Sequence, residues 1–477
     1  MKSYKILLFI FLVIAVLGVM VAVFPENGLQ VGSLTLRFPS MEQILTHRSA
    51  AEQEADSLKI AEIQEMQLKD SLLHDIQDTL AVYEAALSTQ EGRFYFPNDD
   101  LHFFASLYAK LQGAKANGKI YRILHYGDSQ IEMDRISGNL REFFQGRFGG
   151  GGPGLMPAVQ SIPSMAVSQS TEGNYSVYMA YGDGQRTRDG NYGIMAKNYR
   201  MSGANTFWAS ASKQSGVASR VKRFSNIAVL FRDRDGDFSA TLRNRKQGYD
   251  SSMVSMGEGL QLLRWNVDTP MTEFTLRFSG NADIYGIFAD NGYGVSVDNI
   301  PMRGASGTIF TNIKDTLLQK SYQLCDVALI ILQYGGNAMP GIGSQSAVNA
   351  YKERIGRQIA YLHRIYPQAK ILFIGPADMA KKVNGVMDSY PFMAEMVQGL
   401  KEVALANGAA FWDMYSVMGG RRSMLAWYKN GLAGSDFVHF TPAGANKIGN
   451  ILNDSFKMLF DYYDTEKQSR NISAVVE

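Results

Sequence analysis

Short, continuously apolar runs that alternate with helical patterns are the feature that most constrains the fold of this chain. The runs cover residues 121–126, 294–297, 326–332, 369–374 and 410–413. A helical pattern over residues 131–148 follows the first run, and further helical patterns lie between the later runs. Strands that are apolar on both faces and separated by helices form a parallel sheet covered on both sides. The sequence therefore predicts an α/β domain.

The stretch from about residue 157 to residue 291 lacks this helical period. It contains Gly, Ser and Asn turns and short strand candidates at 227–231, 238–242, 260–263 and 274–278. Regularly spaced short strands with turn signals between them are typical of an antiparallel sandwich. We therefore expect an all-β insert of sandwich or jelly-roll type over 158–290, between the first and second strands of the α/β domain.

An unbroken apolar run from Ile6 to Phe24 follows Lys2 and Lys5 near the N-terminus. About 20 apolar residues span a bilayer as a helix. The residues at 21–23 make a poor cleavage site, which favours an uncleaved anchor over a signal peptide, although cleavage stays open. The two lysines orient the N-terminus toward the cytoplasm. We expect a single-pass anchor over 1–25 in the inner membrane, with the rest of the chain on the periplasmic side.

Residues 26–97 read as a helical stalk, because 41–87 are proline-free, polar and loosely periodic. The heptads are irregular, so a solvated helix and a self-associating coiled coil both stay open. The α/β domain is expected in two parts, 98–157 and 291–465, with a tail over 466–477. The net charge is only +2 and the sequence contains no basic stripe, so no nucleic-acid partner is expected.

A serine lies where the first predicted strand ends and a helix begins, in Gly127-Asp128-Ser129-Gln130. Ligands of open parallel sheets bind outside the carboxyl ends of the strands. The N–H of Ser129 also lies near a helix N-terminus, which favours developing negative charge. Taken alone, such a sequence is more often a helix cap than a nucleophile. A catalytic interpretation therefore needs partner residues.

Partner candidates follow later strands in order. Gly307 lies in a glycine-rich turn after the second strand, and Asn337 follows the third. An oxyanion hole combines such backbone N–H groups with a side-chain amide. Asp436 precedes His439 by three residues, so in a turn it reaches one imidazole nitrogen while the other faces the serine. The remaining histidines, which have no comparable neighbour, are His47, His74, His102, His125 and His363.

These four segments resemble the SGNH (GDSL-like) hydrolase superfamily, whose blocks carry Ser, Gly, Asn and His in this order. The resemblance covers roughly 98–157 and 291–465, and implies a flavodoxin-like, three-layer domain. It implies Ser129 as nucleophile, with Asp436 as orienting acid and His439 as base. It also implies the Ser129 N–H, Gly307 and Asn337 as oxyanion donors, with no cofactor and no metal. Two positions depart from the usual pattern, namely Gln130 for Leu and Ala338 for Asp.

An SGNH core split by a β-rich insert further resembles bacterial peptidoglycan O-acetylesterases, whose insert is similar to a carbohydrate-binding module. This resemblance implies an extracytoplasmic esterase acting on an O-acetylated cell-wall or surface glycan through an acyl-serine. An O-acyltransferase served by a membrane-bound acyl-transfer partner uses the same residues and stays open. The alternative is a non-catalytic glycan-binding envelope protein, with Trp208 and Trp265 as candidate stacking platforms.

Overall fold

The computed structural model describes residues 3–25, 27–32, 34–46 and 50–476. These residues form two compact units, the first from residues 1–81 and 464–477 and the second from residues 82–463. Each unit is considered by itself. Lys2 and His47 lie outside the described residues.

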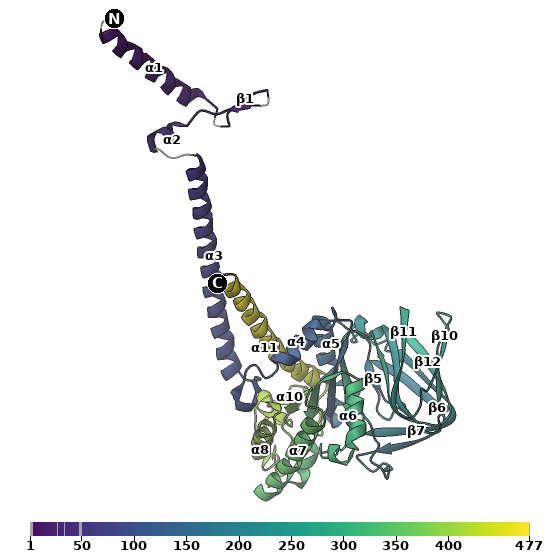
Figure 1. Cartoon of the computed structure of the whole chain (residues 1–477). Coiled ribbons are helices and arrows are strands. Elements are labelled where there is room, and N and C mark those ends of the chain that lie inside the picture. The colour runs from purple at the N-terminus through teal and green to yellow at the C-terminus, as the bar shows by residue number, and fades with distance from the viewer. Residues whose placement is uncertain (1–2, 26, 33, 47–49, 477) are drawn as a thin grey trace. The chain divides into compact units, whose positions relative to one another are not determined.

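The first unit is mostly helical (Figure 1). Its elements are α1 (Ser3–Val23), β1 (Leu29–Val31), β2 (Leu34–Leu36), α2 (Met41–Thr46), most of α3 (Ala50–Thr89) and the end of α11 (Pro442–Val476). By length and composition, Tyr4–Val23 is a helix that can cross a membrane, a property that signal sequences share. α3 is rich in Ala, Leu, Glu and Gln, which favour helices, and Glu65 pairs with Lys69 one turn later at 2.8 Å.

A six-stranded mixed sheet is one of the two large sheets of the second unit. Its strands, in spatial order, are β14 (Gly294–Pro301), β4 (Ile120–Gly127), β15 (Val327–Gln333), β16 (Lys370–Ile374), β19 (Ala410–Trp412) and β3 (Phe94–Tyr95). The first five are parallel, and β3 pairs antiparallel with β19. In chain order the parallel strands run second, first, third, fourth, fifth, as in flavodoxin-like sheets. Each predicted strand of this group is present.

The strands of this sheet are apolar on both faces, and helices pack against it and bury them. The covering elements are α4 (Ala105–Gly113), α5 (Ser137–Phe148), α6 (Asp315–Leu324), α7 (Gln345–Ile365), α8 (Met393–Ala406), α9 (Met414–Met418), α10 (Ser423–Lys429) and the first part of α11. All seven residues of β15 are buried. Tyr126, Ile330 and Phe373 share one hydrophobic core with α6, α7 and α8. A short hairpin, β17 (Ala380–Val383) and β18 (Val386–Ser389), follows β16.

The predicted helix over 131–148 is wrong in its first turn. The chain instead forms a 3₁₀ segment, η2 (Ser129–Asp134), and α5 starts only at Ser137. Met133, Asp134 and Ile136 have φ of 58°, 58° and 63°, which is uncommon for non-glycine residues. The buried carboxylate of Asp134 binds the chain at 164–166, so tertiary contacts override the local helical period.

A largely antiparallel sheet lies between β4 and β14 in the sequence. Its strands are β5 (Gly154–Met156), β6 (Val167–Met179), β7 (Lys197–Ala211), β8 (Phe224–Asp233), β9 (Ser239–Asn244), β10 (Tyr249–Val254), β11 (Gly259–Met271), β12 (Glu273–Ser279) and β13 (Ala282–Asp290). β7 pairs with β6 along one edge, and along the other edge it pairs with both β12 and β13. The sheet therefore divides into two arms, one of β12, β9 and β10 and the other of β13, β8 and β11. Phe224 of one arm packs against Phe274 of the other, with ring centroids 5.6 Å apart.

Candidate active site

Three of the predicted site residues form one hydrogen-bonded series. Ser129 Oγ lies 2.7 Å from His439 Nε2, and His439 Nδ1 lies 2.7 Å from Asp436 Oδ2. The other carboxylate oxygen of Asp436 accepts the backbone N–H groups of Val438 and His439, at 3.0 and 3.1 Å. The carboxylate therefore fixes the orientation of the imidazole, and the second ring nitrogen faces the serine hydroxyl.

The charge of Asp436 is supported by its hydrogen bonds. Partial burial raises the pKa of this carboxyl group, but the bonds from the His439 ring and from two backbone N–H groups outweigh it, so the pKa is lowered. The side chains of Asp436 and His439 are 51% and 37% exposed. Asp436 is therefore an ionised partner for His439 that remains accessible to solvent.

The 3₁₀ segment that begins at Ser129 is capped by Asp128, the residue before the serine. Asp128 Oδ1 accepts the N–H of Gln130 at 2.9 Å, as expected of a helix cap. Burial raises the pKa of the Asp128 carboxyl group to about 6, although the Gln130 N–H, His439 and the Asn337 amide oppose this rise. The cap and the paired serine coexist in this turn, since Asp128 holds the backbone while Ser129 faces His439.

A cavity of about 220 Å³ opens at the paired serine. Ser129, His439 and Asn337 line it together with Gln333 at the end of β15 and Tyr390 after the β17–β18 hairpin. Asn337 Nδ2 donates to the Ala305 carbonyl at 3.2 Å. The predicted amide thus lies on the wall of the same cavity as the predicted nucleophile.

Gly307 does not line this cavity. It is buried with a φ of +76°, and a Cβ at this position would lie 2.7 Å from Cδ2 of Tyr334. Gly304, in the same loop, is exposed with a φ of +75°, in a turn closed by the Ala305 N–H on the Met302 carbonyl at 3.0 Å. The oxyanion role of Gly307 stays a prediction, and Gly304 is a second glycine that sequence reasoning did not single out.

Sequence reasoning also missed side chains that hold the site loops. The guanidinium group of Arg303 makes two parallel hydrogen bonds of 2.7 Å to the carboxylate of Glu132. These bonds join the loop after β14 to η2, the segment that begins at Ser129. Gln130 binds the loop that carries His439. Such residues can be suspected from the sequence because they are polar and lie next to a predicted site segment. Their partners cannot be predicted in this way, because the partners are distant in the sequence.

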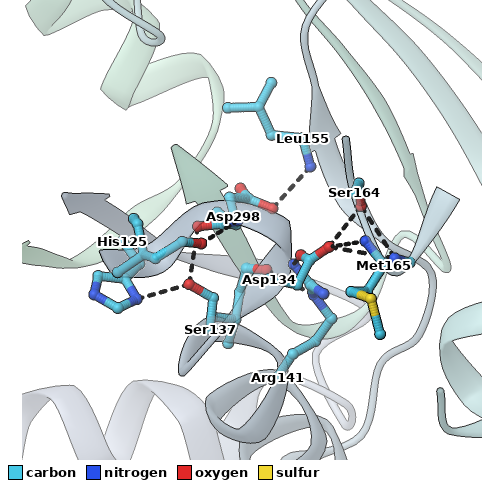
Figure 2. A network of polar contacts seen from close by, with 12 residues as sticks. His125, Asp134, Ser137, Arg141, Leu155, Ser164, Met165 and Asp298 are labelled. Atoms are coloured by element: carbon cyan, nitrogen blue, oxygen red, sulfur yellow. Dashed lines mark hydrogen bonds and ion pairs between the residues drawn. The ribbon is translucent and has the colours of Figure 1, made fainter. Parts of the chain in front are cut away.

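Figure 2 shows a network of polar contacts that includes His125, Asp134, Ser137 and Asp298. Ser137 Oγ donates to Asn299 Oδ1 at 3.0 Å and lies 2.8 Å from His125 Nδ1. Burial lowers the pKa of His125 to about 4, so this histidine is a neutral core residue. In the same view, Asp298 accepts the Leu155 N–H at 2.9 Å and Asp134 accepts that of Met165 at 2.8 Å. Asp298 thereby binds β5 of the antiparallel sheet, and Asp134 binds the segment that precedes β6.

The remaining candidate residues take different positions. Cys325 is buried. Trp265 is 1% exposed and belongs to the insert core, whereas Trp208 on β7 is 38% exposed. Among the described residues, no group of three His, Cys, Asp or Glu side chains has the arrangement of a metal site.

No protein-family model matches the chain, and no curated protein matches it. A solved peptidoglycan O-acetylesterase is similar to it, with 23% identity, a TM-score of 0.60, and coverage of 75% of this chain and 96% of that one. Two further matches, each with a TM-score of 0.25, are a family two carbohydrate esterase from Cellvibrio japonicus and a carbohydrate acetylesterase from Sinorhizobium meliloti. The first has 10% identity and covers 62% of this chain and 99% of that one, and the second has 14% identity and covers 35% and 80%. The chain therefore shares the fold of that solved peptidoglycan O-acetylesterase over three quarters of its length.

Proposed function

We propose that this chain is a serine esterase that removes O-acetyl groups from a cell-envelope glycan. The observation that carries the proposal is the series Ser129–His439–Asp436, with both links at 2.7 Å beside an open cavity. This is the arrangement by which a base activates a serine and a carboxylate orients the base. The similarity of fold to a peptidoglycan O-acetylesterase supports an acetylated glycan as substrate.

In the first step, Ser129 Oγ attacks the carbonyl carbon of the acetyl ester and its proton moves to His439 Nε2. Asp436 stabilises the imidazolium that forms. The carbonyl oxygen becomes negative, and the proposed donors to it are the Ser129 N–H, the Asn337 amide and the Gly307 N–H. Donors fixed before the reaction stabilise this charge with little rearrangement.

In the second step, the bond to the sugar oxygen breaks and that oxygen takes the proton from His439. Acetyl-Ser129 remains. Water then attacks the acyl carbon while His439 accepts its proton, and acetate leaves as the proton returns to Ser129 Oγ. If a glycan hydroxyl replaces this water, the same residues transfer the acetyl group.

The proposed organisation follows the sequence. Residues 1–25 anchor the protein in the inner membrane, 26–97 form a stalk, and 466–477 form a tail. Residues 98–157 and 291–465 form the catalytic domain, and the insert over 158–290 contacts glycan on the periplasmic side. The apolar helix Tyr4–Val23 supports the anchor by its length and composition.

The test is acetate release from O-acetylated peptidoglycan and hydrolysis of a chromogenic acetate ester by the full chain. Ser129→Ala is expected to abolish both activities, and His363→Ala serves as control because His363 is an exposed histidine on α7. An active Ser129→Ala protein contradicts the proposal. Acetylated glycan product without free acetate identifies a transferase, and glycan binding without any turnover identifies a binding protein.

A further inference from the structure

The residue after the proposed nucleophile makes two bonds to the loop that carries the proposed base. Gln130 Nε2 donates to the Val438 carbonyl at 2.5 Å, and Gln130 Oε1 accepts the Phe440 N–H at 3.4 Å. These partners are the two chain neighbours of His439. The side chain is 8% exposed, so water does not readily replace either bond.

The loop has its own internal bonds, which fix its shape but not its distance from the serine. The Gly434 N–H donates to the His439 carbonyl at 2.8 Å, and the Phe437 N–H donates to the Gly434 carbonyl at 3.1 Å. Phe437 has a φ of +55°, an uncommon conformation for an aromatic residue. A loop held in this strained shape still has to be docked onto η2, the segment that begins at Ser129.

Gln130 belongs to the same rigid turn as Ser129, since its own N–H is held by Asp128 Oδ1 at 2.9 Å. The side-chain amide of Gln130, the residue next to Ser129, therefore binds the chain on both sides of His439. Other contacts also hold the loop, such as the Ala380 N–H on the Phe437 carbonyl at 3.1 Å and Arg135 Nη1 on the Phe440 carbonyl at 3.4 Å. A leucine at position 130 has no donor or acceptor for either bond.

We propose that Gln130 is a positioning residue that sets the distance between Ser129 Oγ and His439 Nε2. This inference rests on the proposed esterase function for its catalytic consequence. Displacement of a reacting group by about 1 Å costs up to about 10²-fold in rate. Loss of the two bonds is therefore expected to lower kcat and to leave substrate binding largely unchanged, because Gln130 holds the base rather than the glycan.

The test compares Gln130→Met and Gln130→Glu in the full chain. Methionine keeps the length of the side chain but loses both bonds. Glutamate keeps the acceptor for the Phe440 N–H and sets an oxygen against the Val438 carbonyl. The matched control is Gln358→Met, since Gln358 on α7 is 4% exposed and its amide makes two similar bonds to Thr311, at 3.0 and 3.1 Å.

Both Gln130 variants are expected to lower kcat on a chromogenic acetate ester, and the rate of Ser129 labelling by a fluorophosphonate probe, by about 10–100-fold. KM is expected to change less than threefold, and Gln358→Met is expected to keep the wild-type kcat. Hydrogen exchange of the peptide over 434–441 is expected to accelerate in both Gln130 variants, because methionine lacks both bonds and glutamate repels the Val438 carbonyl. Wild-type kcat in both Gln130 variants, or unchanged exchange at 434–441, overturns the inference. A wild-type protein without turnover or labelling refutes the esterase proposal instead, and the exchange data still decide whether Gln130 holds the loop.

Discussion

Ser129 Oγ and His439 Nε2 lie 2.7 Å apart, although 310 positions separate the two residues in the chain. Ser129 follows the carboxyl end of β4, and His439 lies just before Pro442, the first residue of α11. The intervening chain contains the whole antiparallel insert. Their approach therefore depends on the sheet order and on the docking of the loop before α11.

Replacing Asp436 by asparagine is expected to lower kcat by about 10²–10⁴-fold, because an amide neither stabilises the imidazolium nor fixes the tautomer. The side chain is 51% exposed, which favours the lower end of this range. Steady-state kinetics on an acetate ester measure the effect. Asp233→Asn is the control, since Asp233 Oδ1 accepts two backbone N–H groups in the insert, as Asp436 Oδ1 does in its own loop. An equal kcat for wild type and Asp436→Asn contradicts the assigned role.

Gly304 and Gly307 share a φ near +75° but have different surroundings. Alanine at either position incurs a backbone cost of about 1–2 kcal/mol. At Gly307, the added Cβ also meets the ring of Tyr334 at 2.7 Å, whereas at Gly304 it meets nothing within 4 Å. Urea unfolding is expected to show Gly307→Ala less stable than Gly304→Ala by about 1–3 kcal/mol. Equal losses would show that the loop shifts freely away from Tyr334.

Burial of Asp128 predicts a pH-dependent penalty on folding. Its pKa is raised from 3.8 to about 6, so between these values the folded chain binds a proton that the unfolded chain has released. Stability therefore falls as the pH rises through this window, by at most about 3 kcal/mol. Asp128→Asn removes the titrating group. Urea unfolding is expected to show that the free energy of unfolding of the variant, relative to that of the wild type, is higher at pH 7 than at pH 4. A difference that is the same at both pH values contradicts the prediction.

Asp134 is expected to behave in the opposite way. Burial raises the pKa of its carboxyl group, but Arg141 at 2.9 Å and three bonds from 164–166 outweigh this, so the pKa is lowered. Its contribution is present above the ordinary pKa and is lost as the pH falls through the lower, folded value. Asp134→Asn leaves Arg141 buried without its ion pair, and about 3–5 kcal/mol of unfolding free energy is expected to be lost at pH 7. A loss below 1 kcal/mol at that pH would contradict this assignment.

The two tryptophans of the insert are expected to separate binding from stability. Trp208 lies between Ser170 of β6 and Thr275 of β12 and is 38% exposed. Trp208→Ala is expected to weaken glycan binding by roughly 2–10-fold with little change in Tm. Trp265 is 1% exposed, so Trp265→Ala is expected to cost about 3–5 kcal/mol. Glycan pull-down and thermal melts measure both, and unchanged binding by Trp208→Ala excludes it as a platform.

Local patterns predicted the strands of the parallel sheet because each of them is a short run buried on both faces. The same reasoning missed β6, whose residues alternate between exposed and partly buried positions and include few apolar side chains. It also extended a helix across Met133–Ile136, where contacts of Asp134 with a distant segment impose left-handed backbone. Strands and turns that depend on distant partners leave no local period to detect.

The sequence alone determined the order of Ser129, Asn337, Asp436 and His439 and the strand ends that Ser129 and Asn337 follow, because side-chain type and local periodicity are properties of short segments. Tertiary structure decided the rest. The pairing of Ser129 with His439, the burial of Gly307 against Tyr334 and the bonds of Gln130 to both neighbours of His439 join residues far apart in the chain. Such contacts form only when sheet and loops pack together, and packing is a property of the whole fold.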